Sequence, residues 1–122
     1  MNWTNLTEKT VAITGGACGI GLAVAKGFAE VGANVILADF AEEQGAEAID
    51  EISSLGSGEA FFVRCDVTSK ADVENMVATA VERFGRLDVL VNNAGINVPR
   101  LLVDPAGKEE LTEDIWDKVF AV

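Results

Sequence analysis

Closely spaced glycines near the start of the chain form the segment best suited to bind a charged group. The segment follows a short β-branched run and reads Thr14-Gly15-Gly16-Ala17-Cys18-Gly19-Ile20-Gly21. Gly15 allows a tight turn, Gly19 leaves bare backbone where a pyrophosphate comes close, and Gly21 opens a helix whose free N–H groups favour negative charge. The GxxxGxG spacing lacks the lysine of a P-loop, which argues against a nucleoside triphosphatase. A purely structural tight turn remains the alternative.

The elements around this loop alternate between strand and helix. Residues 10–14 form a β-branched run typical of a buried strand, and a helix then follows with apolar residues at helical spacing. These residues are Ile20, Val24, Gly27, Phe28 and Val31. Gly32 is placed to end the helix in a positive-φ conformation. Residues 35–38 predict a second strand, followed by a helix with its inner face at Ala48, Ile49, Ile52 and Leu55 and its end near Gly56.

The same unit occurs again after residue 56. Residues 60–63 predict a third strand, and Ser69 with Asp72 has the form of a capping box that opens a third helix. Apolar residues from Val73 to Phe84 give the clearest helical periodicity in the chain, with Met76 and Phe84 in the core. Gly85 closes this helix, residues 87–91 predict a fourth strand, and Thr112 is placed as the N-cap of a fourth helix. Alternating strands and helices predict an α/β fold, a doubly wound parallel sheet with strand order 3-2-1-4, left incomplete.

Composition excludes several classes of function. The net charge of −11 opposes binding to nucleic acid or anionic lipid, and no apolar run is long enough to cross a bilayer. Two distant cysteines without any histidine give no metal-ligand pattern, so we expect no metal site. We interpret the protein as cytoplasmic, with Cys18 and Cys65 as reduced thiols, a regulatory thiol being the alternative.

Two motifs in the right order resemble those of the short-chain dehydrogenase/reductases. Residues 14–21 resemble the TGxxxGIG motif of that family, and residues 92–95 resemble its NNAG motif; Asp66-Val67 and Trp116-Asp117 also match family positions. The resemblance covers essentially the whole chain. It implies an oxidoreductase with a Rossmann-type NAD(P)-binding domain, of which residues 1–122 are the N-terminal portion. The residues it places at the cofactor are Gly15, Cys18, Gly19, Ile20, Gly21, Asp39, Phe40, Asp66, Val67, Asn93, Ala94 and Gly95.

Asp39 directs the cofactor prediction toward NAD, with NADP less favoured. A carboxylate after the second strand can accept hydrogen bonds from both ribose hydroxyls, but it repels a 2′-phosphate. Local alternatives stay open: Asp39 could cap the second helix, Asp66 could cap a turn, and Asn93 could be a turn former. Cys18 departs from the family, in which a serine or similar residue is usual, and a thiol is a weaker donor than a hydroxyl.

The catalytic residues that the resemblance implies are a Ser, a Tyr and a Lys, with a supporting Asn on the fourth helix. The chain contains no Tyr, so we expect the catalytic site beyond Val122 and an inactive chain when it is expressed alone. A non-catalytic dinucleotide-binding module and an inactive fragment are the rival interpretations. The loop at residues 97–104 resembles that of sorbitol-6-phosphate dehydrogenases of the family. Arg100 is the candidate contact to an anionic alcohol or carbonyl substrate, and a solvent-exposed arginine is the alternative. We expect the full-length protein to form a homo-oligomer.

Overall fold

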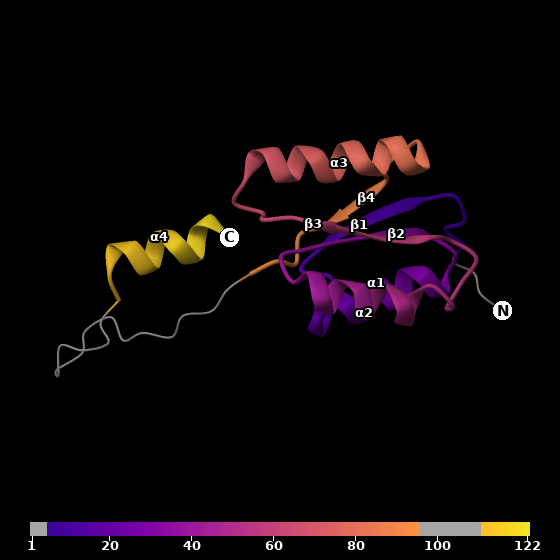
Figure 1. Cartoon of the computed structure of the whole chain (residues 1–122), viewed down its shortest axis with the longest axis horizontal. Coiled ribbons are helices and arrows are strands. Elements are labelled where there is room, and N and C mark those ends of the chain that lie inside the picture. The colour runs from indigo at the N-terminus through magenta and orange to yellow at the C-terminus, as the bar shows by residue number, and fades with distance from the viewer. Residues whose placement is uncertain (1–4, 96–110) are drawn as a thin grey trace.

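A computed structural model describes residues 5–95 and 111–122 of the chain. Strands and helices alternate along the sequence (Figure 1). The elements are β1 (Thr10–Thr14), α1 (Gly19–Glu30), β2 (Asn34–Asp39), α2 (Glu42–Ile52), β3 (Ala60–Arg64), α3 (Lys70–Phe84), β4 (Val89–Val91) and α4 (Glu113–Ala121). The four strands are parallel in the order β3-β2-β1-β4. The predicted doubly wound fold and its strand order are therefore confirmed.

The two faces of the sheet are covered unequally. Helices α1 and α2 lie on one face and α3 on the other (Figure 1). Val11, Ile13 and Leu37 belong to the buried cluster on the first face, and Ala12 and Ile36 belong to the cluster on the second. Because side chains alternate along a strand, the continuous apolar run of β1 supplies both clusters, and every residue of this strand is buried.

Helix α1 packs through smaller residues than the sequence predicted. Gly21, Ala25 and Ala29 are its buried positions, whereas Ile20 is 76% exposed. Val24 and Phe28 pack at the edge of the first cluster. The predicted face was therefore rotated by about one residue, because the glycine loop brings the start of the helix so close to the sheet that only small side chains fit there. Gly32 does have the expected positive φ, at 93°.

Helix α2 ends at Ile52, before the predicted end near Gly56, and Leu55 is 36% exposed.

Helix α3 begins as predicted, because Ser69 Oγ accepts a hydrogen bond from Asp72 N at 3.2 Å. The second arm of the capping box is different: Asp72 Oδ2 accepts from Asp66 N instead. Met76 is buried and Phe84 packs on the second cluster, while Gly85 ends the helix at φ 78°.

Strand β4 is shorter than predicted and lies at an edge of the sheet. Leu87 precedes the strand and packs on the second cluster. Val89 and Leu90 are 37% and 43% exposed. Thr112 caps α4 by accepting from Ile115 N at 3.2 Å, as predicted. None of the helices within residues 5–95 and 111–122 is long and apolar enough to cross a membrane.

Candidate dinucleotide site

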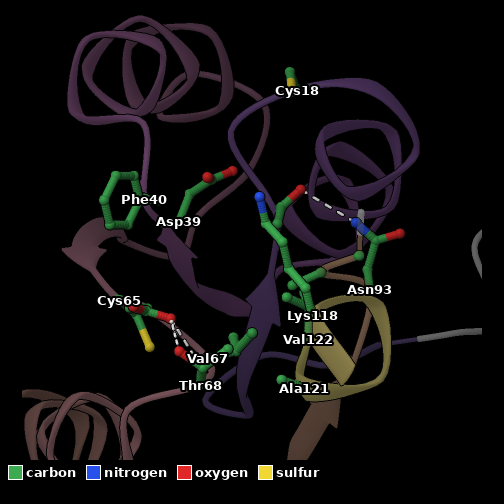
Figure 2. A pocket seen from close by; sticks show the side chains of 14 residues that line it. Cys18, Asp39, Phe40, Cys65, Val67, Thr68, Asn93, Lys118, Ala121 and Val122 are labelled. Carbon is green, nitrogen blue, oxygen red and sulfur yellow. Dashed lines mark hydrogen bonds between the residues drawn. The ribbon is translucent and has the colours of Figure 1, made fainter. Parts of the chain in front are cut away.

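A pocket of about 970 Å³ opens where the strands end and the helices begin. Its size is at the upper end of the range for small-molecule sites, about 300–1,000 Å³. Figure 2 shows the side chains that converge on it. The lining residues are Gly15, Cys18, Asp39, Phe40, Cys65, Asp66, Val67, Thr68, Asn93, Ala94, Gly95, Lys118, Ala121 and Val122. The pocket thus lies at the carboxyl edge of a parallel sheet, the edge at which such folds bind ligands.

The glycine turn has the backbone geometry that its sequence predicted. Gly15 has φ 66° and Gly19 has φ 59°, conformations that other residues adopt at a cost. Gly15 N donates to Ala38 O at 2.7 Å, which fixes the turn against β2. A Cβ on Gly21 would overlap the carbonyl oxygen of Gly15. The first turn of α1 itself bears no acidic side chain.

Thr14 and Asn93 join the glycine turn to the end of β4. Thr14 Oγ1 accepts from Asn93 N at 3.0 Å and from Ala94 N at 3.1 Å. Asn93 Nδ2 donates to Gly15 O at 3.2 Å (Figure 2). Asn93 is therefore more than a turn former, because its side chain bridges two segments that are 78 residues apart in the sequence.

Asp39 joins the glycine turn to the end of β2. Its Oδ2 accepts from Ala17 N at 3.0 Å, and its Oδ1 accepts from Ala41 N at 3.2 Å. Ala41, not Asp39, is the N-cap residue of α2, so the helix-cap alternative for Asp39 is wrong. The neighbouring Phe40 is 61% exposed along the pocket wall, and the Arg64 guanidinium lies 4.5 Å from the centre of its ring.

Asp66 has a local structural role as well as its place in the pocket. Its Oδ1 accepts from Thr68 N at 2.9 Å and from Thr68 Oγ1 at 2.6 Å. These hydrogen bonds hold the pKa of the Asp66 carboxyl below its usual value. Burial, and then the charges of Asp72 and Asp66, raise the pKa of the Cys65 thiol, which keeps Cys65 protonated at neutral pH.

Most of the predicted site residues do converge on the pocket. Nine of them line it: Gly15, Cys18, Asp39, Phe40, Asp66, Val67, Asn93, Ala94 and Gly95. Gly19, Ile20 and Gly21 form the first turn of α1 and are not among the lining residues. Arg100 lies outside the described residues.

Sequence reasoning missed two groups of residues. Thr14 was predicted as the end of a strand and the first residue of the glycine motif, but its hydrogen bonds to the segment after β4 were not predicted. Cys65, Thr68, two residues of α4 and its C-cap residue Val122 also line the pocket. Lys118, Ala121 and Val122 occur at positions i, i+3 and i+4, so one face of α4 meets the pocket.

The chemistry of these groups fits a dinucleotide. The glycine turn and the N-terminus of α1 offer bare backbone and positive potential to a pyrophosphate. Asp39 and Asp66 offer carboxylate oxygens as acceptors for hydroxyl or amino groups. Phe40 and Val67 offer apolar surface for a flat base, so the two ends of the pocket suit different parts of one such ligand.

Comparison with known proteins decides the family. The family model described as short chain dehydrogenase matches residues 9–122. The chain belongs to the short chain dehydrogenase family. The resemblance of its motifs to that family is thereby confirmed.

Individual dehydrogenases support the same assignment. The 2,5-dichloro-2,5-cyclohexadiene-1,4-diol dehydrogenase LinX of Sphingobium indicum is 45% identical over 96% of this chain. A short chain dehydrogenase structure from Mycobacterium smegmatis has a TM-score of 0.86, with 36% identity over the whole chain and half of its own length. The structure of NAD+-bound xylitol dehydrogenase has a TM-score of 0.83, with 31% identity over 96% of this chain and 43% of its own. The chain spans 44% of the length of LinX.

Proposed function

We propose that the protein containing this chain is an NAD-dependent oxidoreductase that interconverts an alcohol and a carbonyl on a small molecule. In this proposal residues 1–122 supply the cofactor-binding part. The observation that carries it is the pair of bridges at the pocket: Asn93 Nδ2 to Gly15 O, and Ala17 N to Asp39 Oδ2. They hold the ends of β1, β2 and β4 around one space that fits a dinucleotide.

The bound nicotinamide would supply the hydride acceptor or donor, and the described residues bind and orient the cofactor. The glycine turn takes the pyrophosphate, and Asp66 and Val67 border the adenine. Asn93, Ala94 and Gly95 line the part of the pocket beyond β4. The Ser, Tyr and Lys that carry proton transfer in the family are expected beyond Val122.

Asp39 supports NAD over NADP. It lines the pocket at the end of β2, where its carboxylate would meet the adenosine ribose and repel a 2′-phosphate. In the full-length protein we expect kcat/KM to be higher with NADH than with NADPH. Asp39→Asn, which removes the charge and keeps the shape, should narrow this preference by roughly tenfold, a change of about 1.4 kcal/mol.

Asp88→Asn is the matched control for this experiment. It removes the same charge at the amino end of the sheet, where Asp88 bonds to Thr10 N, and it should leave the preference unchanged. A wild-type protein that prefers NADPH would overturn the role given to Asp39. A protein that binds NADH but turns over no alcohol or ketone would instead be a non-catalytic dinucleotide-binding module.

For the substrate we propose a polyol or a sugar phosphate. The relatives named for a cyclic diol and for xylitol are named for molecules with more than one hydroxyl group, and residues 97–104 resemble the corresponding loop of sorbitol-6-phosphate dehydrogenases. A panel of polyols, cyclic diols and their phosphorylated counterparts tests this class. Arg100→Ala should raise KM for a phosphorylated polyol more than for the unphosphorylated one. Equal effects on the two KM values would contradict a contact between Arg100 and a substrate phosphate.

A further inference from the structure

Helix α4 brings a positive charge into a pocket that is otherwise acidic. Among the described residues that line the pocket, Asp39 and Asp66 are carboxylates and Lys118 is the single cation. The whole chain has a net charge of −11, which disfavours an anionic ligand throughout. A local cation, in addition to the dipole of α1, would therefore favour the binding of a dinucleotide with a charged pyrophosphate here.

The position of Lys118 suits this task. Lys118, Ala121 and Val122 form the face of α4 that meets the pocket, and Lys118 is the only one of them with a charge or a donor group on its side chain. In the view of Figure 2 the Lys118 side chain lies between those of Asp39 and Asn93. Gly15, in the glycine turn, lines the same pocket.

Two of the other lysines in the described part of the chain, Lys26 and Lys70, already have ion-pair partners. Lys26 Nζ lies 2.8 Å from Glu51 Oε2, and Lys70 Nζ lies 3.7 Å from Glu74 Oε1. Within residues 5–95 and 111–122, no carboxylate forms an ion pair with Lys118, although Asp117 is its neighbour in sequence. No carboxylate in the described part of the chain therefore competes with a ligand for the ammonium of Lys118, and its flexible stem lets it act as a point charge.

We propose that Lys118 pairs with the pyrophosphate of the dinucleotide and is a binding residue of this site, supplied by α4. The inference rests on the proposed function and extends it to a residue that the family motifs do not mark. It also gives α4 a part in the cofactor site, so that the anionic centre of the ligand lies between a helix N-terminus on one side and an ammonium on the other.

The test is a fluorescence titration of the full-length protein with NADH at several salt concentrations. Lys118→Gln should raise the Kd for NADH about threefold to fivefold at low salt, the range expected for an exposed ion pair. It should also flatten the rise of Kd with salt, because one screened charge pair has been removed. Lys118→Arg should retain most of the wild-type affinity and its salt dependence.

Lys70→Gln is the matched control, because it makes the same change in net charge at a side chain that is 91% exposed on α3. It should leave the Kd at the wild-type value. Equal Kd values and salt slopes for Lys118→Gln and Lys70→Gln would overturn the inference. A loss of affinity for NADPH alone would also overturn it, because Lys118 would then bind the 2′-phosphate and not the pyrophosphate. If the wild-type protein binds neither NADH nor NADPH, the proposed function itself fails.

Discussion

Two threonines at opposite ends of β1 have the same burial and different partners. Thr10 is fully buried and Thr14 is 4% exposed. Thr14 Oγ1 accepts two backbone N–H groups from the segment after β4. Thr10 Oγ1 has no hydrogen-bond partner in the part of the chain that the structure describes. One hydroxyl is therefore used to position the pocket, and the other fills space in the sheet.

The aspartates at the two ends of the sheet repeat this contrast. At the carboxyl end, Asp39 connects β2 to the glycine turn and lines the pocket. At the amino end, Asp88 accepts from Thr10 N at 2.9 Å and from Arg86 Nη2 at 2.7 Å. Similar carboxylates thus line the pocket at one end of the sheet and join β1 to the segment before β4 at the other. Substitutions at the two ends should therefore separate ligand affinity from stability.

We expect the largest effect from Gly21→Ala. Its new methyl group would overlap Gly15 O, which should displace the glycine turn and lower NADH affinity by roughly tenfold or more. Overpacking of this kind also costs about 1–3 kcal/mol of stability.

Gly27→Ala, in the same helix, is the control for Gly21→Ala. No atom lies within 4 Å of the added Cβ, so this change should raise stability by about 0.5–1 kcal/mol and leave affinity unchanged. NADH titration and urea unfolding measure both quantities. Equal affinities for the two variants would contradict the geometry assigned to the turn.

A smaller effect is expected from the pair of threonines. Thr14→Val leaves the N–H groups of Asn93 and Ala94 without their acceptor, which should cost about 1–3 kcal/mol and weaken NADH binding. Thr10→Val replaces a hydroxyl that has no partner among the described residues. The free energy of unfolding should therefore fall by no more than about 0.5 kcal/mol, or should increase. The contrast is lost if both substitutions destabilise the protein equally.

The smallest effect concerns acid stability at the amino end. Hydrogen bonds from Arg86 and then from Thr10 N lower the pKa of the Asp88 carboxyl in the folded protein. The stability from this group is complete above the unfolded pKa, about pH 4, and is lost as the pH falls through the lowered folded value.

Asp88→Asn should therefore lower Tm by a few degrees at neutral pH and flatten the loss of stability below about pH 4. Thermal melts between neutral and acid pH measure this change. The Kd for NADH at neutral pH should stay at the wild-type value. A raised Kd would mean that the two ends of the sheet are coupled.

The sequence was sufficient to predict the features that depend on local pattern. The glycine turn and the caps at Ser69 and Thr112 follow from residue types with strong conformational preferences. The strand order follows from the alternation of strands and helices in a doubly wound fold. The shared pocket of Gly15, Asp39, Asp66 and Asn93 follows from the topology, because the carboxyl ends of parallel strands meet at one edge.

The features that it did not predict depend on contacts between distant segments. Lys118 is ordinary for an amphipathic helix, and nothing in its neighbours indicates that its face of α4 meets the pocket. Hydrophobic periodicity also predicted the wrong buried face for α1. At Gly21 the helix backbone comes so close to that of Gly15 that the buried position has no room for a large apolar side chain. The Asp72 carboxylate accepts a hydrogen bond from Asp66 N in place of the second capping-box bond, because the fold brings Asp66 N close to it.

The exposure of Cys18 gives the site an experimental handle. Cys18 lies in the glycine turn, is exposed and lines the pocket. Cys65 is 3% exposed, and its raised pKa keeps its thiol protonated. Of these two cysteines, only Cys18 should therefore react with a maleimide dye at neutral pH, and no substitution is needed to introduce the label. A dye placed there would report in real time when the pocket fills and empties.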